Sequence, residues 1–232
     1  MEKKNFSLAI AVVAASFVLG IFFYVSRPTN DTIRVTGLAT KPFESDIIKW
    51  RLTIARNVGL NDISAGYEKL SDDLKALRGH FKKGNIPDSS VTLQPAVAMG
   101  NYGQGGIVGY NLTQSLYIIS SDITTIEEMA TNPAKFFSSG VLVQSSQLEY
   151  YSSHLSELKY ELLAEATRDA QRRAEEIAKT ANVTLKNIVS ARAGVFQIRE
   201  PYSTEVNDYG VYNSSTRKKE ISVTMNAEYA IQ

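Results

Sequence analysis

Residues 6–25 are almost entirely apolar, with two lysines before the run and Ser26-Arg27-Pro28 after it. At about 1.5 Å of rise per residue, a helix of this length spans the roughly 30 Å hydrocarbon core of a bilayer. The run ends in bulky residues at 22–25, whereas a signal peptidase site has small residues. We therefore expect residues 1–27 to be an uncleaved signal anchor that forms one transmembrane helix. A cleaved signal peptide is the alternative.

Lys3 and Lys4 favour a cytoplasmic N-terminus, because positive charge tends to stay on the cytoplasmic side of a membrane. Residues 28–232 are then expected to form one domain outside the cytoplasmic membrane, attached to it through residues 6–25. A chain of this length can bury roughly 70% of its unfolded surface without a metal ion or disulfide. If the leader is cleaved, the same domain is released from the membrane.

Two segments alternate apolar and polar residues with the period of a half-buried strand. In residues 48–54 the apolar residues stand at the even positions, and in residues 220–231 they stand at the odd positions. Side chains of a strand point alternately to its two faces. Each segment is therefore predicted to be a strand with one buried and one exposed face.

Two other segments carry apolar residues at the spacing of a helix. In residues 63–81 they recur every three or four positions, with Asn61 or Asp62 as the N-cap and Gly84 as a left-handed residue that ends the helix. A weaker helix pattern covers residues 123–139, where Pro133 is expected to break or kink it.

The longest predicted helix covers residues 155–181. Alanines recur every four residues from Ala166 to Ala178, and small residues at this spacing let a helix approach a sheet closely. Asp169 and Arg173 have the spacing of an ion pair along one helix face.

The remaining strand patterns complete a mixed fold. Strands are expected at 33–37, 91–99, 109–119, 141–143 and 188–198, with a glycine-rich hairpin connection at 100–106. The order is βαββαβ followed by αββ. It predicts an α+β fold in which helices pack on one side of a mainly antiparallel sheet.

Composition excludes several classes of function. The 232 residues include 25 Lys and Arg against 24 Asp and Glu, so no overall basic field attracts nucleic acid. Without cysteine there is no thiol nucleophile, thiolate metal site or iron–sulfur cluster. The glycines at 103–109 lack dinucleotide-binding spacing, and His80 and His154 have no second ligand nearby in sequence. We predict no catalytic, cofactor-binding or metal-binding residues. The enzymatic alternative is a hydrolase that uses His154 with a sequence-distant carboxylate, or a pair of carboxylates.

Four segments carry a family resemblance: Ile33-Arg34-Val35-Thr36-Gly37 leading to Asp46, Gly109-Tyr110 before an alternating strand, the alanine-rich helix around Glu165-Ala166 and Arg173-Ala174, and the last strand at 221–225. Over residues 32–231 the chain resembles the SIMPL-domain family of bacterial envelope proteins. The resemblance implies an extracytoplasmic or periplasmic α+β protein. It also implies a link to oxidative-stress tolerance and assembly into ring-like or channel-like oligomers, as in some members, and no agreed catalytic residues.

A polar segment at residues 199–212 separates the last two predicted strands and contains Tyr202, Tyr209 and Tyr212. Tyrosine combines a large contact area with a polar tip, which suits interfaces. We predict an interaction loop here, with a mobile hairpin loop as the alternative. The expected function is non-enzymatic scaffolding or binding in the cell envelope, as a homo-oligomer anchored in the inner membrane. A monomeric periplasmic module that binds a peptide or small molecule is the second hypothesis.

Overall fold

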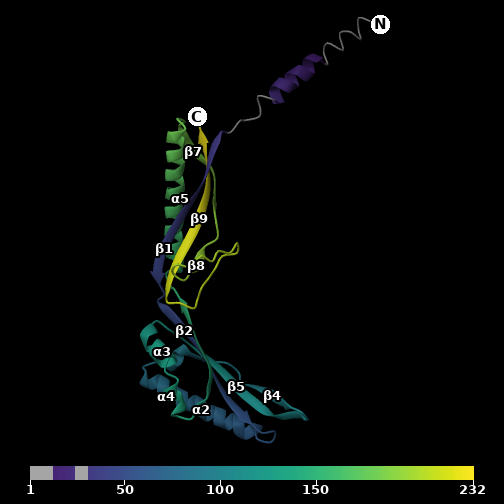
Figure 1. The fold of residues 1–232 in the computed structure, drawn as a ribbon, viewed down its shortest axis with the longest axis vertical. Coiled ribbons are helices and arrows are strands. Elements are labelled where there is room, and N and C mark those ends of the chain that lie inside the picture. The colour runs from purple at the N-terminus through teal and green to yellow at the C-terminus, as the bar shows by residue number, and fades with distance from the viewer. Residues whose placement is uncertain (1–12, 24–30) are drawn as a thin grey trace, which may run out of the picture. The chain divides into compact units, whose positions relative to one another are not determined.

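The computed structural model describes residues 13–23 and 31–232 (Figure 1). It has an α+β fold with antiparallel strand pairing, as the sequence predicts. In chain order the main elements are β1 (Thr32–Glu44), β2 (Ile47–Val58), α2 (Ile63–Lys83), β3 (Val91–Leu93), β4 (Val97–Gly103), β5 (Gly106–Ser120), α3 (Ile123–Ala130), α4 (Ala134–Phe137), β6 (Val143–Tyr151), α5 (Leu155–Thr180), β7 (Leu185–Ala193), β8 (Gln197–Arg199) and β9 (Lys218–Ile231).

The strands form two sheets where one was expected. One has the order β1-β9-β7, with β8 also on β9, and the other has the order β3-β5-β2-β6, with β4 also on β5. Alternation along a strand reveals its buried face but not its neighbours, which is why the pattern could not separate the sheets.

Within the predicted 28–232 domain, the contacts form two compact units. Of the described residues from 31 on, the first unit comprises residues 31–38, Ala166–Gly194 and Met225–Gln232, and the second comprises Ala39–Glu165 and Val195–Thr224. Each unit is assembled from segments far apart in the sequence, so neither corresponds to a continuous stretch of chain.

The core of the second unit forms around β2, whose even positions from 48 to 54 are buried as predicted. Trp50 is fully buried, and its ring lies 5.8 Å from Phe81 of α2 and 6.0 Å from Phe136 of α4. The indole Nε1–H donates to Ser146 Oγ at 2.9 Å, so the one polar atom of this side chain is satisfied. Trp50 thereby joins two helices to the sheet.

The ends of α2 differ from the prediction. Gly84 has φ −86°, and Asn85, with φ +57°, is the left-handed residue. A side chain at Gly84 would place its Cβ 2.9 Å from Met129 Sδ, so this glycine permits close packing rather than an unusual backbone angle. At the other end, Asp62 is the N-cap but its side chain makes no capping hydrogen bond.

Several expected elements are divided by breaks in the chain. The helix pattern at 123–139 forms α3 and α4, and Pro133 is the N-cap of α4, as its predicted breaking role requires. The strand expected at 91–99 forms β3 and β4, which Pro95 separates because proline lacks a backbone donor. The strand expected at 188–198 forms β7 and β8.

The first unit depends on close packing between α5 and β1. The alanines spaced four apart on α5, from Ala166 to Ala178, are buried as predicted. A Cβ at Gly37 would lie 2.2 Å from the carbonyl oxygen of Ala166 and 2.5 Å from the backbone nitrogen of Ala170. Only a residue without a side chain therefore fits at Gly37 where the helix crosses β1.

Residues 13–23 form a helix with exposed apolar side chains. No helix within the described ranges is long and apolar enough to cross a membrane. The remainder of the predicted span, residues 6–12 and 24–25, lies outside the described residues, as does the predicted boundary at residue 27.

We expect Gly37→Ala to lower the free energy of unfolding by about 2 kcal/mol, because the added methyl group overpacks the contact with α5. The matched control is Gly79→Ala on α2, where nothing lies within 4 Å of the added Cβ. The control is expected to gain up to about 1 kcal/mol from helix propensity. Urea unfolding followed by circular dichroism measures both, and equal stability of Gly37→Ala and wild type would contradict the packing argument.

Candidate functional site

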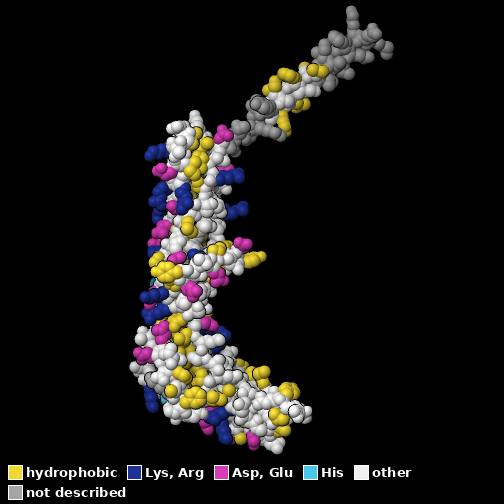
Figure 2. Space-filling view, in the orientation of Figure 1, with side chains coloured by type: hydrophobic (Ala, Val, Ile, Leu, Met, Phe, Trp, Pro, Cys, Tyr) yellow, Lys and Arg dark blue, Asp and Glu magenta, His cyan; other side chains and the backbone are white. Residues whose placement is uncertain are grey.

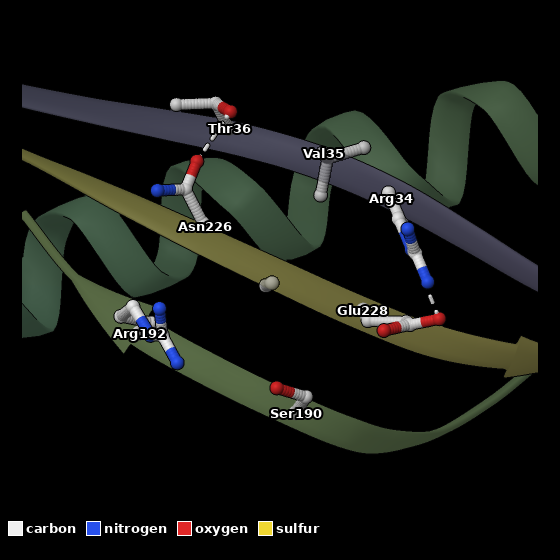
Figure 3. A pocket seen from close by; sticks show the side chains of 8 residues that line it. Arg34, Val35, Thr36, Ser190, Arg192, Asn226 and Glu228 are labelled. Atoms are coloured by element: carbon white, nitrogen blue, oxygen red, sulfur yellow. Dashed lines mark hydrogen bonds and ion pairs between the residues drawn. The ribbon is translucent and has the colours of Figure 1, made fainter.

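A polar hollow of about 480 Å³ lies on the face of the first unit's sheet that α5 does not cover (Figure 3). Its main polar side chains are Arg34 and Thr36 of β1, Asn226 and Glu228 of β9, and Ser190 and Arg192 of β7. Side chains alternate along a strand, so burial of the odd positions of β1 and β9 places the even positions on this open face. The alternate polar residues of the predicted last strand, Asn226 and Glu228, therefore line the hollow.

Hydrogen bonds and an ion pair join β1 to β9 across the hollow. Thr32 Oγ1 donates to Glu228 at 2.7 Å, and Arg34 Nε lies 3.1 Å from the same carboxylate. The bonds from Thr32 and then Arg34 lower the pKa of Glu228, which keeps it ionised. No carboxylate in the described part of the chain pairs with Arg192, which leaves this guanidinium available to an anion.

A second hollow of about 450 Å³ lies between β1 and α5. The backbone N–H of Leu38 donates to Asp169 Oδ2 at 3.0 Å, and Arg173 Nε donates to the same oxygen at 2.7 Å. The Leu38 bond, followed by the Arg173 bond, lowers the pKa of Asp169. The Asp169–Arg173 ion pair predicted from helical spacing is thus confirmed. The same carboxylate also accepts a backbone hydrogen bond from β1.

The predicted interaction loop contains two tyrosines that are almost completely exposed, Tyr202 at 99% and Tyr209 at 96%. Tyr212 differs, because its ring packs on Tyr151 with the centroids 6.0 Å apart. The Gln197 side chain orders the loop by bonding to backbone groups within it, including the carbonyl of Asn207 at 2.8 Å. Tyr202 and Tyr209 therefore face solvent almost completely, and Tyr212 is 46% exposed.

The hairpin formed by β4 and β5 also presents exposed apolar side chains. Met99, Tyr102 and Val108 are 63%, 78% and 60% exposed, and they lie near a two-residue turn where Gly103 pairs with Gly106. The sequence predicts this hairpin. The sequence does not indicate that these apolar side chains are exposed. Tertiary packing decides which face of a sheet a helix covers.

The structure brings His154 beside Asp46, a carboxylate far away in the sequence, with 3.7 Å between His154 Nε2 and Asp46 Oδ2. His154 Nδ1 also lies 3.0 Å from Glu157 Oε2. Ser153 donates to Asp46 and not to the imidazole. Burial alone would raise the pKa of Asp46, but the hydrogen bonds from Ser153 lower it below its ordinary value. The same bonds attach Asp46 to the chain just before α5. His80 bonds to Ser139 Oγ at 2.7 Å.

Groups of metal-ligating side chains are also missing from residues 13–23 and 31–232. No three or more His, Cys, Asp or Glu residues converge there in a way that would hold a metal ion. The arginines that line the two hollows can recognise an anion through charge and hydrogen bonds.

Lys219 of β9 is a buried amine that sequence reasoning missed. Its Nζ donates to Ser45 Oγ at 3.1 Å, to the Tyr150 carbonyl at 3.0 Å and to the Thr216 carbonyl. Burial lowers its pKa to about 8. The signal was available, because Lys219 occupies an odd position of β9, in phase with the buried residues. Ser45 is also buried, so this pair has a structural role.

Lys219 is expected to give the protein a stability that rises with pH between 8 and 9.5. Its folded-state pKa of about 8 is below the ordinary value of 10.5, so the unfolded chain binds more protons in this interval. The difference in unfolding free energy between wild type and Lys219→Met should therefore rise by about 1–2 kcal/mol across the interval.

Denaturant unfolding of both proteins at several pH values measures this difference. Tyr150, whose pKa burial raises to about 12, is present in both proteins, so its own contribution to the pH dependence cancels in the difference. A difference that stays constant with pH would show that Lys219 keeps its proton in the folded state.

The profile of the SIMPL family, described as a protein of unknown function (DUF541), matches residues 33–229. No curated protein matches the chain. The match runs from the start of β1 to the end of β9 and takes in segments of both compact units. Because it covers most of the 232 residues, the chain belongs to the SIMPL family.

Proposed function

We propose that this SIMPL protein is a non-enzymatic scaffold of the bacterial cell envelope that assembles as a homo-oligomer. The observation that supports assembly is the exposed apolar surface of the β4–β5 hairpin. Met99 and Tyr102 are three positions apart on β4, so they point to opposite faces of the hairpin, and both are exposed. Exposed apolar patches mark interaction sites in soluble domains. In Figure 2 the hydrophobic side chains gather over this hairpin.

The hairpin combines its apolar side chains with a free strand edge. β4 pairs with β5 and lies at the margin of the five-stranded sheet. An edge strand presents unpaired backbone groups that favour pairing with another chain, and apolar side chains add burial to that pairing. A second copy of the chain offers the same edge and the same side chains, so the surface suits symmetric self-association.

The proposed location is the inner membrane, with the domain on the periplasmic side. The apolar composition of residues 6–25 and the exposed apolar side chains of the helix at 13–23 support it, since such side chains are stabilised by lipid. Cleavage of the leader would place the same domain free in the periplasm. Any effect on oxidative-stress tolerance would be indirect, because the chain has no cysteine and only four methionines.

A monomeric binding module is the second candidate function. The two hollows of the first unit favour it, because they expose arginines and a strand edge without needing a second copy. The two candidates differ in the mass of the protein in solution.

The full chain in mild detergent is expected to form a discrete oligomer that persists on dilution, as measured by light scattering coupled to size exclusion. Met99→Thr combined with Val108→Thr should shift the mass toward the monomer, because it removes the apolar contact and retains β propensity. The control is Ile119→Thr, which changes a 48% exposed residue of β5 outside the hairpin and should leave the mass unchanged.

A monomer at every concentration would contradict assembly and leave the binding module as the better account. If the hairpin variant and the control lower the measured mass of the oligomer equally, assembly does not depend on this surface.

A further inference from the structure

The polar side chains that β7 and β9 contribute to the first hollow form two rows. Antiparallel pairing places Arg192 of β7 opposite Asn226 of β9, and Ser190 opposite Glu228. Side chains directly opposite each other in such a pair lie about 5 Å apart, and diagonal neighbours lie about 7–8 Å apart. The hollow has a volume of about 480 Å³, within the range of roughly 300–1,000 Å³ that small-molecule sites occupy. One small molecule can therefore contact all four groups.

Bonds to β1 use only part of the polar groups of β9. Thr36 Oγ1 donates to Asn226 Oδ1 at 2.7 Å, and the amide nitrogen of Asn226 stays unbonded among the described residues. Thr32 Oγ1 and Arg34 Nε both meet Glu228 Oε1, at 2.7 and 3.1 Å. No hydrogen bond from the described residues reaches Glu228 Oε2. β9 therefore offers one free donor and one free acceptor to the hollow.

The two β7 side chains have no bonding partner within the part of the chain that the structure describes. Arg192 and Ser190 are both exposed, and in Figure 3 no dashed line reaches either of them. They lie two positions apart on β7, so both point to the open face of the sheet. The hollow therefore presents a free guanidinium, with a free carboxylate oxygen diagonal to it.

The free groups carry one charge of each sign. Arg192 is always protonated, and the bonds from Thr32 and then Arg34 lower the pKa of Glu228, which keeps its carboxylate ionised. A simple anion at Arg192 is repelled by Glu228, and a simple cation at Glu228 is repelled by Arg192. The two side chains are not paired with each other in Figure 3, so a gap lies between them. A ligand that carries both charges satisfies both side chains.

The separation of these charges selects a small ligand. The Cβ atoms of diagonal positions are about 7–8 Å apart, and the side chains of Arg192 and Glu228 extend into that distance. The two charges of the ligand must then lie close together, as the ammonium and carboxylate on one α-carbon do. An extended peptide separates its terminal charges by roughly 3.3–3.6 Å for every residue, which is too far for all but the shortest chains.

We propose that the hollow binds a free α-amino acid. The carboxylate of the ligand pairs with Arg192 and accepts from the amide of Asn226, which lies opposite Arg192. The ammonium of the ligand donates to Glu228 Oε2 and to the Ser190 hydroxyl. The ligand's own side chain points to solvent, because the hollow lies on the open face of the sheet. The site therefore recognises the zwitterion rather than one particular amino acid.

Three probes separate the zwitterion from its two charges at pH 7. L-alanine carries both charges, N-acetyl-L-alanine only the carboxylate, and L-alaninamide only the ammonium. Their binding to the full chain in mild detergent is followed by saturation-transfer difference NMR through the methyl signal. L-alanine is expected to bind with a Kd on the order of 1 mM, because each exposed ion pair contributes little. Each of the other two probes should bind at least about fivefold more weakly.

The probes also supply the results that would overturn the proposal. No binding of L-alanine to wild type would remove the site altogether. Equal binding of N-acetyl-L-alanine would show a site for anions alone, and equal binding of L-alaninamide would show a site for cations alone. Either of these results would overturn the zwitterion.

Arg192→Gln tests the location of the site, and it should leave the fold intact because Arg192 bonds to no described residue. It is expected to weaken L-alanine at least about fivefold. The matched control is Lys186→Gln, which removes a positive charge from the same strand outside the hollow lining and should leave the affinity unchanged. Circular dichroism checks the fold of each variant. Equal effects of the two substitutions would overturn the site.

Glu228→Gln tests the ammonium contact. It should weaken L-alanine but not N-acetyl-L-alanine, because it removes an attraction for the ammonium and a repulsion for the carboxylate. Equal weakening of both probes would overturn the role assigned to Glu228.

The inference goes beyond assembly and gives the binding module, the second candidate function, a class of ligand. The hollow belongs to the first unit, whereas the β4–β5 hairpin belongs to the second. Failure of the hairpin variants to change the mass therefore bears on assembly alone, and failure of L-alanine to bind bears on the hollow alone.

Discussion

The contact between α5 and β1 at Gly37 is the constraint on which the first unit depends. A helix that crosses a strand so closely needs a strand residue without a side chain and helix residues no larger than alanine. The alanines from Ala166 to Ala178 cover one face of the sheet, and the odd residues of β1 and β9 point to that face. Because side chains alternate along a strand, the polar even residues point to the open face, where Arg34 pairs with Glu228.

The second unit is stabilised in a different way, by large side chains and by buried polar groups. Trp50, Phe81 and Phe136 fill its core, whereas Lys219 is surrounded by backbone carbonyls and a hydroxyl. A buried ammonium without a carboxylate is stabilised only by such acceptors, so the groups around it must hold their positions. This cage joins the turn after β1 to β6 and β9, and it ties their geometry to the protonation of one amine.

Features determined by local periodicity could be predicted from the sequence, and features determined by tertiary partners could not. The even positions of β2, the odd positions of β9 and the alanine row of α5 follow from the spacing of side chains alone. The division into two sheets, the packing role of Gly84 and the approach of Asp46 to Ser153 depend on segments far apart in the chain. The free edge of β1 belongs to this second class, because no sequence pattern shows which strand ends a sheet.

The exposed edges of the first unit's sheet differ in the side chains they carry. On β7, Ile188 and Val189 are exposed, so that edge resembles the apolar β4–β5 hairpin and favours association through burial. On β1, the even positions near the edge carry Thr32, Arg34 and Thr36, and each of these side chains already bonds to Glu228 or Asn226 of β9. Pairing along β1 would therefore bury little apolar surface, whereas pairing along β7 would bury more, because the sheet face that α5 covers takes the apolar residues of β1.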